Sequence, residues 1–132
     1  MPQDITDNKV KAEFYLHSDK LDFSDVDNLM GITATSKRSK NTFIFEEFAK
    51  DYWMLFTDYE VSENINVQLE KILNKLPDKK IIRTICKKYN AECGFLIVVE
   101  RGKNDILPGI YYEKEFIKFA AYIGAEINMD FV

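Results

Sequence analysis

Apolar and polar residues alternate near the start of the chain. In residues 10–17, VKAEFYLH, the apolar positions are Val10, Ala12, Phe14 and Leu16. A period of two is typical of a strand buried on one face. Residues 51–60, DYWMLFTDYE, and residues 94–100, GFLIVVE, are instead apolar on both faces near their centres. This pattern predicts two strands inside a sheet, the second of them central.

Three other segments have the composition of short strands. They are residues 32–35, ITAT, residues 106–112, ILPGIYY, and the alternating residues 125–132, AEINMDFV. Pro108 and Gly109 interrupt the second segment, which indicates an edge strand or a bulge. Residues 36–42 read as a loop, and residues 43–50, FIFEEFAK, fit either a strand end or a helical turn.

The first and last predicted helices both end at a glycine. Ser24 and Asp27 form a capping-box-like pair at the start of a short helix over residues 25–30, and Gly31 follows it. An amphipathic helix over residues 113–123 ends in the same way at Gly124.

Two more helices are predicted in the middle of the chain. Ser62 would cap the first, which Pro77 ends, and Asp78 would cap the second. Their inner faces have helical spacing. These apolar residues are Ile65, Leu69, Ile72, Leu73 and Leu76, then Ile81, Ile82, Ile85, Cys86 and Tyr89.

The element order β-α-β-β-α-α-β-β-α-β predicts an α+β fold. We expect helices on one face of a mostly antiparallel or mixed sheet, arranged as two βαβ-like halves. Residues 1–8 read as a flexible tail and residues 9–132 as one domain. The chain has 132 residues, of which 46% are hydrophobic, and this is enough for a core.

The N-terminus has no basic start followed by an apolar run, and no stretch is long enough to span a membrane. These features predict a cytoplasmic protein. The net charge of −4 and the sequence pI near 5.1 argue against a dedicated nucleic-acid binder. Cys86 and Cys93 are expected to be buried thiols, because no CxxC spacing is present.

Few residues suggest metal or nucleophilic chemistry. The single histidine, His17, is the only candidate for an imidazole base, and a structural role suits it better. We therefore expect no catalytic residue, no metal and no cofactor. Paired carboxylates remain a separate hypothesis for an enzyme, with Glu46, Glu47 and Asp51 near the unassigned segment.

Charge is distributed unevenly, which favours a charged partner. The segment DKLDFSDVD lacks the spacing of a calcium loop but could contact a basic protein. Its acids are Asp19, Asp22, Asp25 and Asp27. Two basic groups could instead hold a small anion. These candidates are Lys37, Arg38 and Lys40 with Trp53, and the helix face formed by Lys80, Arg83 and Lys87.

The chain contains, in this order, YLHSDKLDFSDVDNLMGITAT, a Lys-rich loop, YWMLFT and FAAYIGAEINMDF. This order of segments resembles a bacterial family of domains of unknown function, DUF4279. The residues that carry this resemblance are Leu29, Gly31, Ile32, Thr33, Thr35, Lys37, Arg38, Trp53, Phe119, Ile123, Gly124, Ile127 and Asp130. The basic loop departs from the family pattern because it lacks a glycine. The resemblance implies the fold and no particular activity.

Three hypotheses for function follow. The first is a non-enzymatic binding protein of the immunity type, which neutralises a toxin through the acidic segment. The second is a module that binds a small anion through the basic groups. The third is an enzyme that uses carboxylates.

Overall fold

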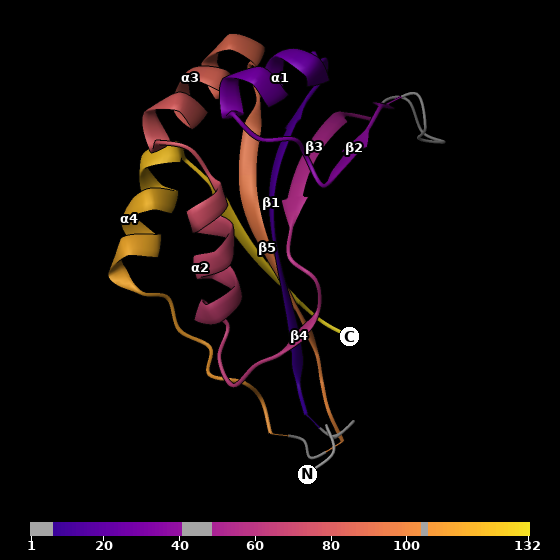
Figure 1. Ribbon diagram of the computed structural model, residues 1–132, viewed down its shortest axis with the longest axis vertical. Helices are drawn as coiled ribbons and strands as arrows, with labels where there is room; N and C mark the ends of the chain where they lie inside the picture. The colour runs from indigo at the N-terminus through magenta and orange to yellow at the C-terminus, as the bar shows by residue number, and fades with distance from the viewer. Residues whose placement is uncertain (1–6, 41–48, 104–105) are drawn as a thin grey trace.

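The computed structural model describes residues 7–40, 49–103 and 106–132. Its helices lie on one face of a single mixed sheet, which confirms the predicted α+β class (Figure 1). The strands are β1 (Lys9–Ser18), β2 (Ser36–Arg38), β3 (Asp51–Phe56), β4 (Glu60–Val61), β5 (Glu92–Glu100) and β6 (Glu126–Phe131). The helices are α1 (Phe23–Met30), α2 (Asn66–Lys75), α3 (Lys79–Tyr89) and α4 (Lys114–Ile123).

The sheet has the strand order β2-β3-β1-β5-β6, and β4 also pairs with β1. All of these pairs are antiparallel except β5 with β6, which are parallel and joined through α4. The unit β5-α4-β6 is therefore a βαβ unit between neighbouring strands. In the first half, β3 lies between β1 and β2, so the βαβ-like arrangement there is split.

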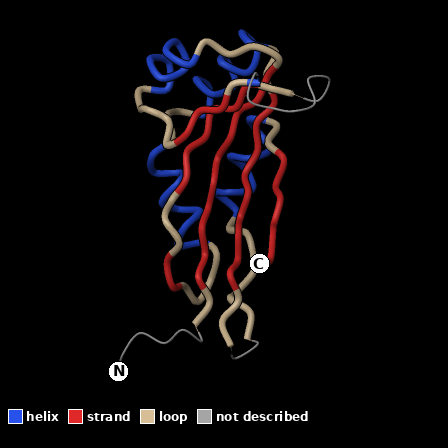
Figure 2. The backbone as a smooth tube through the Cα atoms, turned by 90° about the vertical axis from the view of Figure 1, so that its right-hand side faces the viewer, coloured by secondary structure: helices blue, strands red, loops and turns tan. Residues whose placement is uncertain are grey.

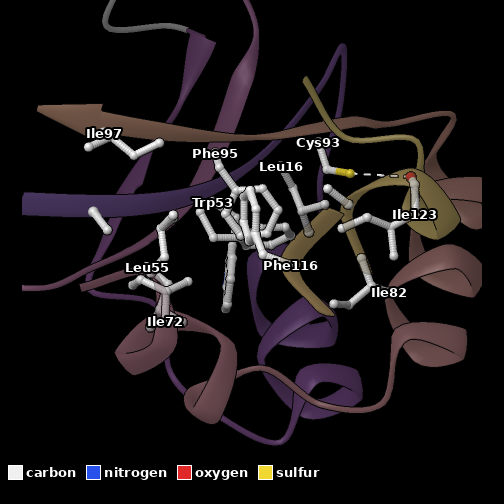
Figure 3. Packing of buried hydrophobic residues seen from close by; sticks show 14 of the residues in the cluster. Leu16, Trp53, Leu55, Ile72, Ile82, Cys93, Phe95, Ile97, Phe116 and Ile123 are labelled. Carbon is white, nitrogen blue, oxygen red and sulfur yellow. Dashed lines mark hydrogen bonds between the residues drawn. The ribbon is translucent and has the colours of Figure 1, made fainter. Parts of the chain in front are cut away.

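The core lies between the sheet and the helices. The predicted face of β1 is buried, and Phe14 packs against Phe95 of β5 with ring centroids 5.3 Å apart. Phe116 of α4 meets Phe95 edge-on at 4.9 Å. Figure 3 shows Phe95 and Phe116 close to Trp53 and Leu16, with Cys93 beside Ile123. Among the described residues, no helix covers the opposite face of the sheet, which faces the viewer in Figure 2.

Two predicted strands were wrong in position or type. The segment 32–35 is not a strand. The strand that pairs with β3 begins later, at Ser36, within the segment predicted to be a loop. Residues 106–112 form one isolated bridge, Gly109 to Asn64, and no ladder. Pro108 has no N–H to donate, which limits pairing there. Residues 43–48, part of the segment left open, lie outside the described residues.

Other boundaries differ because of local hydrogen bonds. The strand predicted over residues 51–60 divides into β3 and β4, and β3 is buried on one face only. Asp22, not Ser24, caps α1, and its side chain accepts from the N–H of Asp25. Ser62 does not cap α2, because its hydroxyl donates to the carbonyl of Asn64.

Candidate functional site

The acidic segment is largely engaged within the protein. Oδ1 of Asp27 accepts hydrogen bonds from the indole N–H of Trp53 at 2.8 Å and from the N–H of Ala34 at 3.3 Å. Its Oδ2 lies 2.5 Å from Nζ of Lys37. Burial alone would raise the pKa of Asp27, but these donors outweigh it and hold the pKa below its usual value. Asp27 therefore joins α1 to β2 and β3.

The other three acids of this segment have separate partners. Asp25 accepts from Nζ of Lys88 at 2.7 Å and from the hydroxyl of Tyr89. The bond to Asp25 raises the pKa of Tyr89 to about 12, and the Lys88 bond lowers the pKa of Asp25. Asp22 caps α1, and Asp19 pairs with Lys50 at 3.0 Å. The four acids thus do not form one unpaired patch.

The predicted basic loop is also tied to the fold. Lys37 is paired with Asp27, and Arg38 lies on β2. The backbone N–H of Lys40 donates to Oδ1 of the buried Asp51 at 2.8 Å. Trp53 is fully buried, so its ring packs in the core and its N–H is taken by Asp27.

The basic face of α3 remains directed outwards. Lys80 and Lys87 are exposed and form no ion pair within the described ranges. The guanidinium carbon of Arg83 lies 5.1 Å from the ring centroid of Tyr122 on α4, and Nζ of Lys79 lies 4.9 Å from it. The structure thus places Lys80, Arg83 and Lys87 on one helix, with Arg83 leaning towards α4.

Sequence reasoning missed a group of rings on the open face of the sheet. The ring centroids of His17 and Tyr52 are 5.2 Å apart, and those of Tyr15 and His17 are 5.9 Å apart. All three side chains are half-buried. The signal was present in the odd-numbered residues of β1, which are aromatic towards its end and face away from the core.

A glycine on the neighbouring strand leaves room for one of these rings. Gly94 is opposite Tyr15, and a Cβ built on it would lie 2.2 Å from the Tyr15 hydroxyl oxygen. The Tyr15 ring therefore extends across β5 to β6, where its hydroxyl accepts from Asn128 at 3.0 Å and lies 3.5 Å from Glu126. Burial, with the nearby charge of Glu126, raises the pKa of Tyr15.

Acidic side chains lie on the β5 and β6 side of this ring cluster, whereas the exposed Arg38 of β2 is in register with Tyr52 on the other side. Oε2 of Glu92 lies 3.6 Å from Nε2 of His17, and the Glu92 side chain is 72% exposed. Glu126 and Asp130 are exposed on β6, in register with Gly94 and Val98 on the same face of the sheet. We call the set Tyr15, His17, Tyr52, Glu92 and Glu126 the ring surface. On the β5 and β6 side, tyrosine rings beside carboxylates suit a cationic partner.

Carboxylates also line a small hollow between α2 and α4. Its volume is about 260 Å³, and Glu70, Glu113 and Glu115 contribute to its walls. Of the carboxylates considered from sequence, Asp51 is held by two backbone N–H groups. Glu46 and Glu47 lie outside the described residues.

Among residues 7–40, 49–103 and 106–132, no group of three or more His, Cys, Asp or Glu side chains is placed to hold a metal ion. Over the same residues, no helix has the length and apolar character needed to cross a bilayer.

Comparison with known proteins gives one match. The family model described as "Domain of unknown function (DUF4279)" matches residues 8–132, nearly the whole chain. No curated protein matches, and no solved structure matches. The match confirms the resemblance seen in the sequence and adds no activity.

Proposed function

The chain belongs to the family of domains of unknown function DUF4279, and from its structure we propose that it is a non-enzymatic cytoplasmic protein that binds a basic protein partner. The proposed relation is that of an immunity-type protein to a toxin that it neutralises. The observation that carries this proposal is the ring surface, where Tyr15, His17 and Tyr52 lie side by side on the face of the sheet that no described helix covers.

The physical properties of the ring surface support protein binding. Tyrosine is enriched at the centres of protein interfaces because a rigid ring offers large contact area and a polar end. The rings stand on paired central strands, so little conformational entropy is lost when a partner orders them. Tyr15 is further fixed by Asn128.

The charges on the β5 and β6 side of the ring surface favour a basic partner over an acidic one. Glu92 and Glu126 border the rings, whereas the acids at positions 19, 25 and 27 already pair with lysines. An acidic border speeds association with a basic surface and disfavours acidic partners. The proposal thus keeps the charge complementarity expected from sequence but moves the contact from α1 to the sheet.

The test uses the protein encoded beside this one in its genome as the probe. Binding is measured by calorimetry, and growth rescue is measured on co-expression. Glu92→Lys should weaken binding about tenfold, equal to about 1.4 kcal/mol, and Tyr52→Ala should weaken it at least as much.

Asp19→Lys is the matched control on the acidic segment, because Asp19 is about as exposed as Glu92 and also contacts one nitrogen-bearing side chain, that of Lys50. It should change binding by less than about twofold. A partner whose affinity falls with Asp19→Lys and not with Glu92→Lys would place the contact on the acidic segment instead. No binding of the neighbouring product by the unaltered protein would remove the proposal.

A second candidate function, binding of a small anion, rests on α3. Lys80 and Lys87 are exposed and without an ion pair in the described chain, and Arg83 and Lys79 share the ring of Tyr122. Inorganic phosphate titrated into labelled protein should shift the amide signals of this helix. The variant Lys80→Ala/Lys87→Ala should abolish the shifts, and signals that never move would exclude the candidate.

A further inference from the structure

The two edges of the sheet differ in length and character. At one edge, β2 has three residues and includes Lys37 and Arg38. Short, basic edge strands are a common protection against pairing with other chains. At the other edge, β6 has six residues, EINMDF, with no proline, glycine or lysine. No strand of the described residues pairs with its outer side.

The backbone of β6 shows which of its groups face outwards. The N–H of Val132 donates to the carbonyl of Val99 at 2.9 Å, and the carbonyl of Val132 accepts from Arg101 at 3.3 Å. Both groups of Val132 therefore point towards β5. Because these directions alternate along a strand, the N–H and C=O groups that point away from the sheet belong to Ile127, Met129 and Phe131.

The side chains of the same residues lie on the helix side of the sheet. Ile127 is in register with Phe95, and Phe131 is in register with Val99, both of which face the core. Ile127 is nevertheless 37% exposed and Phe131 is 47% exposed. Met129 packs against the core. The edge thus combines outward-pointing backbone groups, which no described strand pairs, with apolar side chains that stay partly exposed.

We propose that β6 pairs antiparallel with β6 of a second copy of this chain, about a two-fold axis at Met129. The two sheets then form one continuous sheet with the helices of both copies on the same side. Met129 faces Met129 of the second copy, and Ile127 faces Phe131 of the second copy. Each of these pairs exchanges both N–H···O=C bonds, because all three residues direct their backbone groups outwards.

Charge selects this register over its neighbours. With the axis at Met129, Asn128 faces Asp130 of the second copy, so no two acids are opposed. With the axis at Asn128, Glu126 would face Asp130 of the second copy at two places. With the axis at Asp130, the two Asp130 side chains would face each other. Directly opposed like charges are destabilising in a sheet.

The register also places apolar side chains of the two copies opposite each other. Ile127 and Phe131 of the second copy lie side by side on the helix side, and the symmetry repeats the contact. Pairs of an aromatic and a β-branched residue stabilise antiparallel strands. A pairing of β6 with β2 of another copy would instead leave free edges and grow into filaments.

Two double variants with identical positions test both the pairing and its register. In Ile127→Lys/Phe131→Lys, lysines oppose lysines across the axis, and the dimer should be lost. In Ile127→Lys/Phe131→Glu, each lysine opposes a glutamate of the second copy, and the dimer should be retained. Sedimentation measures the mass, which for the unaltered dimer is twice 15.5 kDa. Circular dichroism verifies that each variant is folded.

Each outcome decides the proposal. A dimer for the unaltered chain, lost in the lysine–lysine variant and present in the lysine–glutamate variant, supports it. An unaltered chain that is monomeric at high concentration, or that forms filaments, overturns it. Two folded variants with the same oligomeric state overturn the register, and a third variant guards against misfolding. Phe131→Pro removes an outward N–H and the exposed ring but no backbone bond to β5, so it should give a folded monomer.

Discussion

The indole N–H of Trp53 donates to Oδ1 of Asp27 at 2.8 Å, so a fully buried ring of β3 is held by a carboxylate of α1. The same carboxylate accepts from Ala34 and pairs with Lys37, which fixes the chain that leads from α1 into β2. A residue that the sequence offered for partner binding thus has a structural role in positioning the first part of the sheet.

Removal of the Asp27 carboxylate should therefore destabilise the fold. Asp27→Ala leaves the buried Trp53 N–H without an acceptor, and we expect the free energy of unfolding to fall by about 2–3 kcal/mol. Asp19→Ala, which removes an exposed ion pair screened by solvent, should have a much smaller effect. Denaturant unfolding followed by the fluorescence of the single tryptophan measures both. Equal losses in the two variants would show that the Trp53 bond contributes little.

Asp27 should also make stability depend on acid pH. Its pKa is lowered in the folded protein, so its stabilising contribution is complete above the unfolded pKa, about 3.9, and is lost as pH falls through the folded value. In Asp27→Asn, this contribution is absent at every pH. The difference in unfolding free energy between the two proteins should therefore shrink as the pH is lowered. A difference that stays constant would contradict the lowered pKa.

Sequence predicted the elements whose signals are local. The alternation of β1 and the glycines after α1 and α4 fix these elements without reference to distant residues, and Gly31 and Gly124 do adopt positive φ. Residues 106–112 had a strand-like composition, but whether a segment joins a sheet depends on a neighbour with free backbone groups. The structure gives this segment a single bridge.

The alternation of β1 indicated that Tyr15 and His17 share a face, but the rest of the ring surface could not be predicted, for the same reason. Tyr15, Gly94 and Asn128 lie on three strands far apart in the sequence, and they meet only because of the strand order and register. In the acidic residues 19–27, distant partners instead occupy a site that the sequence had predicted. Their composition suggested a free charged segment, whereas their partners Lys37, Lys50 and Lys88 are distant in the chain.

The start of α1 offers a direct comparison of two capping residues. Asp22 accepts from the N–H of Asp25 at 3.1 Å, whereas the sequence favoured Ser24 as the cap. Asp22→Ala should lower stability by about 1 kcal/mol, and Ser24→Ala should lower it by less than about 0.5 kcal/mol. Thermal unfolding of the two variants measures the difference. The reverse order of effects would indicate that the helix begins at Ser24.

The two cysteines should differ in reactivity. Cys93 is 2% exposed, its Sγ lies 3.5 Å from the carbonyl oxygen of Ile123, and its interaction with Cys86 together with burial raises the pKa of its thiol. At neutral pH, iodoacetamide should modify the half-buried Cys86 first and Cys93 only after unfolding, because the thiolate is the reactive form. Mass spectrometry of the peptides identifies the modified residue. Equal rates in the folded protein would contradict the burial of Cys93.

Gly94 provides a test of how the ring surface is built. In Gly94→Ala, the new methyl group would lie 2.2 Å from the hydroxyl oxygen and 2.4 Å from Cζ of Tyr15, so the ring must move away from Asn128. We expect a loss of about 1–3 kcal/mol of stability from this overpacking. When Tyr15 is also replaced by Ala, the ring that clashes with the new methyl group is absent, so Gly94→Ala should lower stability far less. A double-mutant cycle by denaturant unfolding measures this coupling, which should exceed about 0.5 kcal/mol. Additive effects would mean that Gly94 serves some purpose other than making room for Tyr15.

Partner binding gives a second measurement of the same substitution, because displacing Tyr15 disrupts the ring surface while leaving the acids at positions 92 and 126 in place. Gly94→Ala should therefore weaken binding of the proposed partner more than does a core substitution that lowers stability by the same amount, such as Ile72→Val.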